Sequence, residues 1–159
     1  VDIGAARPPV FPVKGEAVAL WAGDDNLRLV VRAPGAYLCP KADGRLVVGA
    51  TEIAGETSLD PSPAAIDGLK QAGAAAFPAS AGFLEAERWA GLRPATPDAA
   101  PILGLVPAGP DGLFFALGHY RNGVLLAPET AAALAPLILR GEHCAGLAAF
   151  SAARFPLTS

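Results

Sequence analysis

The residues best suited to chemistry lie in a short turn bracketed by glycines, G-H-Y-R-N-G, at residues 118–123. An apolar segment precedes the turn and an Ala-rich segment follows it, so the pattern predicts a strand that leads into a helix N-terminus. Such an N-terminus exposes N–H groups and carries a partial positive charge, which suits an anionic ligand. The alternative is an ordinary helix with a polar N-terminal loop, in which Arg121 caps a neighbouring carbonyl group. Composition alone favours this alternative.

A second candidate is Arg93, which ends an apolar segment and is followed by Pro94. The chain turns at such a pair, so the guanidinium group can project into a cleft. Arginine binds a carboxylate through two parallel hydrogen bonds, and Tyr37 would help to orient a polar substrate if its ring faced the same cleft. The alternatives are an ordinary strand tyrosine and a surface arginine paired with an acidic side chain. The acidic side chains in reach along the sequence are Glu85, Glu87 and Asp98.

Motifs of several other enzyme classes are missing from the sequence. It contains no G-x-S-x-G, P-loop, H-E-x-x-H or G-x-G-x-x-G motif. His119 and His143 lie far apart, and Cys39 and Cys144 form no C-x-x-C pair. We therefore expect no metal site and no disulfide framework, but two small buried thiols.

The first half of the chain has the pattern of antiparallel β-structure. Short apolar segments at residues 15–21, 27–33, 36–41 and 45–51 are separated by turn residues. Asp43-Gly44 is typical of a tight hairpin turn, which places Tyr37 and Val48 on paired strands.

A helix is predicted over residues 62–78. Ser62 would be its N-cap and Pro63 its first residue, while Ile66, Leu69 and Gly73 form one stripe that should pack on the sheet.

The second half begins with a strand at residues 82–94 and a turn-rich segment after it. Residues 112–117 are almost wholly apolar, which predicts a strand buried on both faces. The helix that follows would have Asn122 as N-cap and Gly141 just past its end. Pro128 and Pro136 should bend or shorten this helix.

Composition limits the class of protein. A chain of 159 residues with 52% hydrophobic residues fits one domain with a buried core. A net charge of -3 offers no basic field for nucleic acid. Pro, Gly or charge interrupts the most apolar windows within about ten residues, so no membrane span is expected. The chain starts at Val1, contains no Met and shows no signal peptide at its start, which suggests a fragment of a longer protein.

Four stretches, in this order, resemble the C-terminal portion of the glycine oxidase family, the thiamine-biosynthesis type within the D-amino-acid oxidase group of FAD-dependent oxidoreductases. The order and spacing of the stretches agree with that family over nearly the whole chain. They are PVKGEAVAL at residues 12–20, YLCPKADGRLVVGATE at 37–52, WAGLRPATPDAAPILG at 89–104 and GHYRNGVLLAPETA at 118–131.

The resemblance implies an α+β fold, in which an antiparallel sheet flanked by helices binds the substrate and a Rossmann-like domain binds FAD. Residues 1–111 would be the later part of the substrate domain, and residues 112–159 the last helical segment of the FAD domain. The segment that cradles the FAD pyrophosphate would be missing, so the isolated chain should lack FAD and be inactive.

The resemblance also assigns roles to residues. Arg93 and Tyr37 match the side chains that bind the substrate carboxylate, Arg121 matches an arginine near the substrate, and Glu52 matches a position that lines the pocket. The cofactor-binding positions that it implies are Gly91, Gly118, His119, Tyr120, Asn122, Gly123 and Val124.

The activity implied is oxidation of a small amino acid or amine by hydride transfer to flavin. Molecular oxygen would reoxidise the flavin, and the products would be an oxo acid, ammonia and hydrogen peroxide. Departures at Ala99, Ala100 and residues 53–63 leave the substrate preference open. Sarcosine oxidase and quinone-linked D-amino-acid dehydrogenase remain alternatives, as does a flavin-free chain without enzymatic activity. We expect a cytoplasmic protein, and self-association through apolar surface that the missing part would cover.

Overall fold

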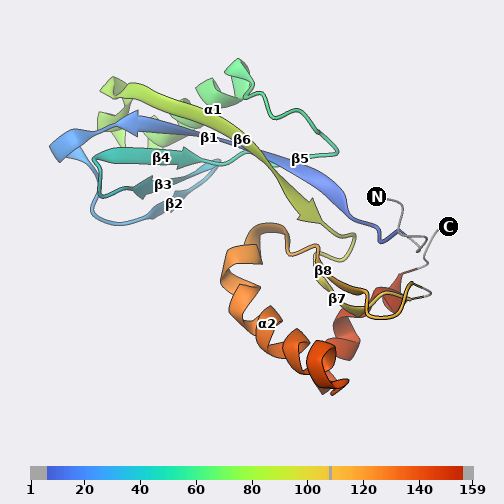
Figure 1. Ribbon diagram of the computed structural model, residues 1–159. Helices are drawn as coiled ribbons and strands as arrows, with labels where there is room; N and C mark the ends of the chain where they lie inside the picture. The colour runs from blue at the N-terminus through green and yellow to red at the C-terminus, as the bar shows by residue number, and fades with distance from the viewer. Residues whose placement is uncertain (1–6, 108, 156–159) are drawn as a thin grey trace. The chain divides into compact units, whose positions relative to one another are not determined.

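The computed structural model describes residues 7–107 and 109–155, which form two compact units. One unit is Pro12–Leu92, and the other contains the described residues of Val1–Phe11 and Arg93–Ser159. We call them the sheet unit and the α2 unit after their main elements, which are labelled in Figure 1. The division between the units lies after Leu92. The assignment of residues 1–111 to a substrate domain and of residues 112–159 to an FAD domain stays a prediction.

The sheet unit is built on one six-stranded sheet. Its strands follow the order β2-β3-β4-β1-β5, and β6 also pairs with β1, beside which it runs in Figure 1. The pairings of β1 with β4 and β5, and of β3 with β2 and β4, are antiparallel. The strands are β1 (Phe11–Trp21), β2 (Val31–Ala33), β3 (Ala36–Pro40), β4 (Arg45–Gly49), β5 (Ile53–Ala54) and β6 (Leu84–Ala95). The predicted α+β fold with an antiparallel sheet and helices is confirmed.

The predicted hairpin joins β3 to β4. Gly44 has a φ of 84°, the left-handed conformation that favours glycine. The register pairs Leu38 with Val48 and Tyr37 with Gly49, so the prediction that Tyr37 and Val48 lie on paired strands is confirmed. The expected strand at residues 27–33 is shorter and begins only at Val31.

One face of the sheet is covered by helix α1 (Pro63–Ala76), with Pro63 at its first position as predicted. Its buried residues are the expected stripe of Ile66, Leu69 and Gly73. Gly73 is close to the sheet, since a Cβ atom there would lie 3.2 Å from a Val48 methyl group. The core of the unit consists of Val18, Leu20, Ala22, Ala36, Leu38, Leu46, Val48, Ile66 and Leu69. A short 3-10 helix, η2 (Pro78–Gly82), leads from α1 toward β6.

The α2 unit contains an antiparallel pair, β7 (Ile102–Leu105) and β8 (Phe114–Leu117), and helix α2 (Gly123–Arg140). Leu103 of β7 packs with Leu134 and Leu137 of α2. The sequence missed β7, and it wrongly predicted full burial of the next strand, because Ala116 in β8 is exposed. Three 3-10 helices complete the unit: η3 (Tyr120–Asn122), η4 (Ala145–Phe150) and η5 (Ala152–Arg154).

Helix α2 begins and ends where the sequence predicts. Asn122 occupies the N-cap position, and Gly141 ends the helix with a φ of 70°. The prolines do not shorten it, since the helix continues for 18 residues through Pro128 and Pro136. Burial of Leu134 and Leu137 compensates for the hydrogen bonds that the prolines cannot donate.

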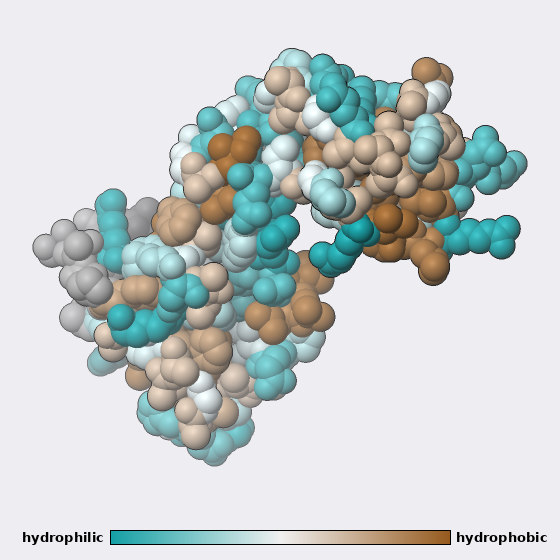
Figure 2. Space-filling view, turned by 180° about the vertical axis from the view of Figure 1, so that it is seen from behind, coloured by the Kyte–Doolittle hydropathy of each residue, from teal (hydrophilic) through white to brown (hydrophobic). Residues whose placement is uncertain are grey.

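The outward face of α2 is strongly apolar. Val124 and Leu125 are 94% and 78% exposed, and Leu139 is 74% exposed. Residues Tyr120–Arg140 are long and apolar enough to cross a membrane by length and composition alone, with a mean hydropathy of 1.4. The expectation that no segment would reach this length is therefore wrong, although a single helix of this kind is weak evidence for a membrane span. Hydrophobic side chains reach the surface in both units (Figure 2).

Candidate functional site

Tyr37 lies at one end of an open groove on the sheet. The groove measures about 600 Å³, and the side chains that line it alternate along β3, β4 and β6. Arg45 in this groove binds Asp43 at 2.8 Å and Glu87 at 3.0 Å. The lining residues are Tyr37, Cys39, Lys41, Arg45, Val47, Glu87 and Trp89. The sheet unit thus presents the candidate substrate tyrosine on a polar, partly basic surface.

The ring of Tyr37 crosses the backbone of Gly49 on the neighbouring strand. A Cβ atom at Gly49 would lie 2.7 Å from the Tyr37 hydroxyl oxygen and 2.8 Å from Cζ. These distances are too short for any side chain, so Tyr37 can take this position only because residue 49 is glycine. This contact could not be predicted from the sequence, because it depends on the register of two strands.

Replacing Gly49 by alanine should displace the Tyr37 hydroxyl at little cost in stability. The atoms in conflict are the far end of a side chain, which can rotate away, so we expect a loss of about 1 kcal/mol, at the low end of the cost of overpacking. NMR should show new ring resonances for Tyr37 and altered contacts to residue 49. Gly68→Ala is the control, since a Cβ atom there would meet nothing within 4 Å. Unchanged Tyr37 resonances in Gly49→Ala would contradict this account.

Two other predicted positions belong to the sheet unit. Glu52 follows β4 and is exposed. Gly91 lies in β6, is also exposed, and has open space where a side chain would be. Close approach within the sheet unit therefore does not explain the glycine at residue 91.

Arg93 lies near the end of β6 and is half-buried. The three carboxylates considered as its surface partners each bind another cation. Glu85 binds Lys70 and Arg88, Glu87 binds Arg45, and Asp98 binds Arg154. The structure places Arg93 in the α2 unit and Tyr37 in the sheet unit.

The glycine-bracketed turn connects β8 to α2, as the sequence predicts. Gly118 is buried with a φ of 76°, and a Cβ atom there would lie 2.6 Å from the Thr96 methyl group. Tyr120 has a φ of 52°, which is uncommon for a residue other than glycine. His119 Nε2 lies 3.0 Å from the Thr130 hydroxyl oxygen, which ties the turn to α2. Gly118 therefore has to be glycine for both conformational and steric reasons.

The remaining turn residues lie around the start of α2. Arg121 and Asn122 are exposed, and the Arg121 guanidinium lies 5.8 Å from the centre of the Tyr120 ring. The backbone N–H of Asn122 donates to the backbone carbonyl oxygen of His119 at 3.0 Å. The Asn122 side chain makes no capping hydrogen bond to α2. Gly123 and Val124 begin the helix. Because the Asn122 side chain makes no capping hydrogen bond, it does not bind their N–H groups.

These features fit part of FAD. The N-terminus of α2, which the Asn122 side chain does not cap, can accept a flat ring with partial negative charge. The pyrophosphate requires a glycine-rich strand-to-helix turn of the G-x-G-x-x-G type, and the sequence contains none. Among the described residues, no group of three His, Cys, Asp or Glu side chains could hold a metal ion.

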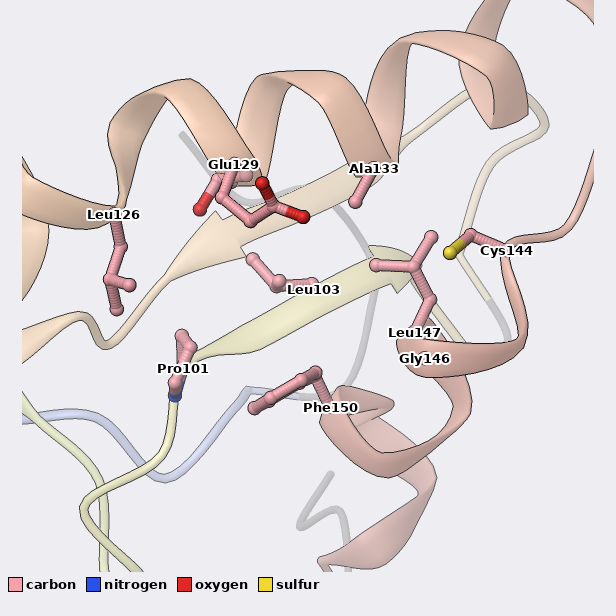
Figure 3. A pocket seen from close by; sticks show the side chains of 10 residues that line it. Pro101, Leu103, Leu126, Glu129, Ala133, Cys144, Gly146, Leu147 and Phe150 are labelled. Carbon is pink, nitrogen blue, oxygen red and sulfur yellow. The ribbon is translucent and has the colours of Figure 1, made fainter.

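A separate pocket of about 160 Å³ lies between β7, α2 and η4 (Figure 3). Leu103 faces Leu126 and Ala133 across it, with Leu147 and Phe150 on another side. Cys144 at its edge is exposed and Cys39 is only partly buried, so the expectation of two buried thiols is wrong. None of the predicted site residues lines this pocket.

Asp98, which the sequence suggested only as a partner of Arg93, binds Arg154 in the C-terminal segment. Asp98 Oδ2 accepts a hydrogen bond from Arg154 Nε at 2.7 Å, and Oδ1 accepts one from the Ala100 amide at 3.1 Å. Chiefly because of the Arg154 guanidinium, the pKa of the Asp98 carboxyl falls from 3.8 to about 2. The sequence offered no signal for this pair, which is 56 residues apart.

The Asp98 pair should make the α2 unit sensitive to acid. A depressed pKa contributes stability above the unfolded value near 3.8, and this contribution is lost as the pH falls toward 2. Asp98→Asn should therefore lower the urea concentration at the midpoint of unfolding at pH 6. The difference in this midpoint between the variant and the parent chain should shrink by pH 2. Amide signals of β7 and β8 followed by NMR would measure it, with the exposed Asp111→Asn as control. A difference that does not change with pH would contradict the assignment.

Comparison with known proteins gives the family. The family model described as FAD dependent oxidoreductase matches residues 2–137. The glycine oxidase of Geobacillus kaustophilus is 40% identical over 91% of this chain, which covers 38% of that protein. The bifunctional protein ThiO/ThiG of Synechocystis sp. is 43% identical over 95% of this chain and 24% of its own length.

Solved structures agree. The crystal structure of glycine oxidase from Geobacillus kaustophilus matches with a TM-score of 0.87 and 38% identity, over 95% of this chain and 41% of that one. L-proline dehydrogenase from P. horikoshii matches with a TM-score of 0.81 and 25% identity, over 94% and 41% of the two chains. The chain thus spans well under half the length of these relatives. It belongs to the DAO family of FAD-dependent oxidoreductases and is related to glycine oxidase and ThiO.

Proposed function

We propose that this chain is the C-terminal part of an FAD-dependent amino-acid oxidase of the glycine oxidase type. The observation that carries the proposal is the glycine-bracketed turn, from which α2 starts without a capping side chain. A surface of this kind suits the edge of a flavin ring. We accordingly assign residues 1–111 to a substrate domain and residues 112–159 to the last segment of an FAD domain.

In this proposal, backbone groups of the turn hold the flavin ring. The N–H groups at the start of α2 stabilise negative charge on the ring, because they lie at the helix N-terminus, which carries a partial positive charge. The proposed cofactor-binding residues are Gly91, Gly118, His119, Tyr120, Asn122, Gly123 and Val124. When bound, FAD supplies the acceptor for the hydride that leaves the substrate α-carbon.

The substrate is a small amino acid whose carboxylate binds Arg93 and the Tyr37 hydroxyl. Arginine suits this role because its planar guanidinium donates two parallel hydrogen bonds. Arg121 adds positive charge close to the turn, and Glu52 lines the side-chain pocket. These residues bind and orient the substrate, and much of the rate comes from that positioning.

The overall reaction converts the amino acid, oxygen and water into an oxo acid, ammonia and hydrogen peroxide. Because the chain has no pyrophosphate-binding motif, the 159 residues alone should bind FAD poorly and be inactive. A role in thiamine biosynthesis, through the glycine imine, belongs to the same proposal.

The exposed apolar face of α2 would be covered by the rest of a complete protein rather than by lipid, since the relatives are more than twice as long as this chain. We therefore propose a cytoplasmic protein. Cell fractionation tests this, and recovery of the complete protein with the membranes would contradict it. The isolated chain should self-associate through this face, which sedimentation would detect.

Intact mass and the absorbance spectrum of the purified protein test the proposed activity. Flavin bands in a protein well above 16.0 kDa, together with oxygen consumption on glycine, would support it. Reduction of an artificial dye without oxygen consumption would favour a dehydrogenase of the same family, and oxidation of sarcosine in preference to glycine a sarcosine oxidase. A colourless full-length protein would contradict the proposal and favour a flavin-free chain.

A further inference from the structure

Arg154, at the end of η5, binds the loop at residues 96–101 through several hydrogen bonds. Arg154 Nε donates to Asp98 Oδ2 at 2.7 Å, and its Nη2 donates to the carbonyl oxygens of Ala100 and Pro101 at 2.8 and 3.0 Å. Its Nη1 atom donates to the carbonyl oxygens of Phe150 at 2.8 Å and Ser151 at 3.1 Å. All three nitrogens of the guanidinium are therefore in use, and its side chain is only 18% exposed.

This loop packs against Gly118, the first residue of the glycine-bracketed turn. The Thr96 hydroxyl lies 2.7 Å from the Ala100 carbonyl oxygen and 3.1 Å from Asp98 Oδ1, and Thr96 is 3% exposed. The Thr96 methyl group occupies the space beside Gly118, where a Cβ atom would be 2.6 Å away. A Cβ atom at Gly118 would also lie 3.8 Å from Pro101 Cα, so the loop contacts Gly118 at both of its ends.

The same loop begins three residues after Arg93 in the chain. One network thus connects the C-terminal segment, the loop that follows the candidate carboxylate-binding arginine, and the turn that begins at Gly118. All of its members belong to the α2 unit. The network depends on the fork of the guanidinium, since a lysine at residue 154 has one nitrogen and cannot reach these acceptors together.

We propose that Arg154 is a positioning residue, which acts through Asp98 and Thr96 to fix residues 118–123 beside the loop. The role of those residues in flavin binding rests on the proposed function, but their coupling to Arg154 does not. A residue that only stabilises the α2 unit would affect β7, β8 and α2 alike. A positioning residue affects the turn before it affects the rest of the unit.

Amide hydrogen exchange on the full-length protein that contains this chain tests the coupling, with and without FAD. In Arg154→Lys we expect exchange to accelerate at least about tenfold more at residues 118–123 than around Leu134 and Leu137, where it reports only the lower stability of the α2 unit. Asp98→Asn, a milder change, should act in the same direction and covers the case in which Arg154→Lys does not fold. Arg140→Lys is the matched control, because Arg140 forms an exposed two-bond pair with Glu142 in the same unit.

FAD affinity gives the second measurement. Arg154→Lys should weaken FAD binding by about tenfold, with Arg140→Lys unchanged, as measured by flavin fluorescence on titration. Equal acceleration of exchange throughout the α2 unit, or none at residues 118–123, would overturn the proposed role of Arg154. If exchange changes locally as expected but the parent protein binds no FAD, the proposed function fails and the positioning role stands.

Discussion

Replacing Lys14 by methionine should destabilise the sheet unit by about 3 kcal/mol, because the change leaves a buried carboxylate without its cation. Lys14 is 4% exposed and Glu16 is 0% exposed, and their charged atoms lie 3.3 Å apart. Glu16 also accepts hydrogen bonds from the Ser62 amide at 2.6 Å and the Thr51 hydroxyl at 3.1 Å. These contacts remain in the variant, so the expected loss is at the lower end for a broken buried pair.

The loss should depend on pH. Burial raises the pKa of the Glu16 carboxyl, but hydrogen bonds from Ser62, Thr51 and Lys14 outweigh it and hold the pKa below the ordinary 4.5. Glu16 therefore contributes stability above about pH 4.5, which is lost as the pH falls through its lowered pKa. Without Lys14 the carboxyl protonates more readily, so Lys14→Met should cost less at pH 4 than at pH 7.

Tryptophan fluorescence during urea unfolding measures this effect. The only two tryptophans, Trp21 and Trp89, both belong to the sheet unit, so the signal reports on that unit. Lys70→Met is the control, because it removes a more exposed lysine from its pair with Glu85 and should cost no more than about 1 kcal/mol. If the two variants lost the same free energy of unfolding, the buried Lys14–Glu16 pair would contribute no more than an exposed pair.

Replacing Arg93 by alanine in the full-length protein should raise KM for glycine on the order of 100-fold. This follows from the proposed carboxylate contact, since a paired, charge-assisted hydrogen bond lost from a binding site costs about 3 kcal/mol. Arg93→Lys should restore only part of the affinity, because one ammonium group cannot make both hydrogen bonds. The turnover number should change less than KM if Arg93 chiefly binds and orients the substrate.

Two comparisons separate a carboxylate contact from general damage. An amine that lacks the carboxylate should be oxidised equally well, or equally poorly, by the parent enzyme and by Arg93→Ala. Arg88→Ala alters an exposed arginine in the same strand and should leave KM unchanged. Unaltered kinetics on glycine in Arg93→Ala would remove Arg93 from the site.

The parts of the fold that the sequence predicted correctly are those with local signals. Asp43-Gly44 fixes the β3–β4 hairpin, Pro63 marks the start of α1, and Gly141 marks the end of α2. Strand β7 was missed because four residues between turn signals have no periodicity, and their pairing with β8 depends on residues further along the chain.

The candidate site shows the same division. Tyr37, Arg93 and the glycine-bracketed turn could be named because they lie in short recognisable motifs. What holds them could not, because each support depends on distant residues: Gly49 opposes Tyr37 across two strands, and Arg154 reaches back 56 residues to Asp98. Glu16 likewise binds Thr51 and Ser62, which lie 35 and 46 residues away.

The contact between Tyr37 and Gly49 restricts the order in which relatives of this chain can change. While the aromatic ring crosses the neighbouring strand, residue 49 has no tolerated alternative that keeps the hydroxyl in place. A lineage that first replaces the tyrosine by a smaller residue frees that position for alanine or serine, whereas the reverse order passes through a displaced ring. Among homologues, side chains at residue 49 should therefore appear together with loss of the tyrosine at residue 37.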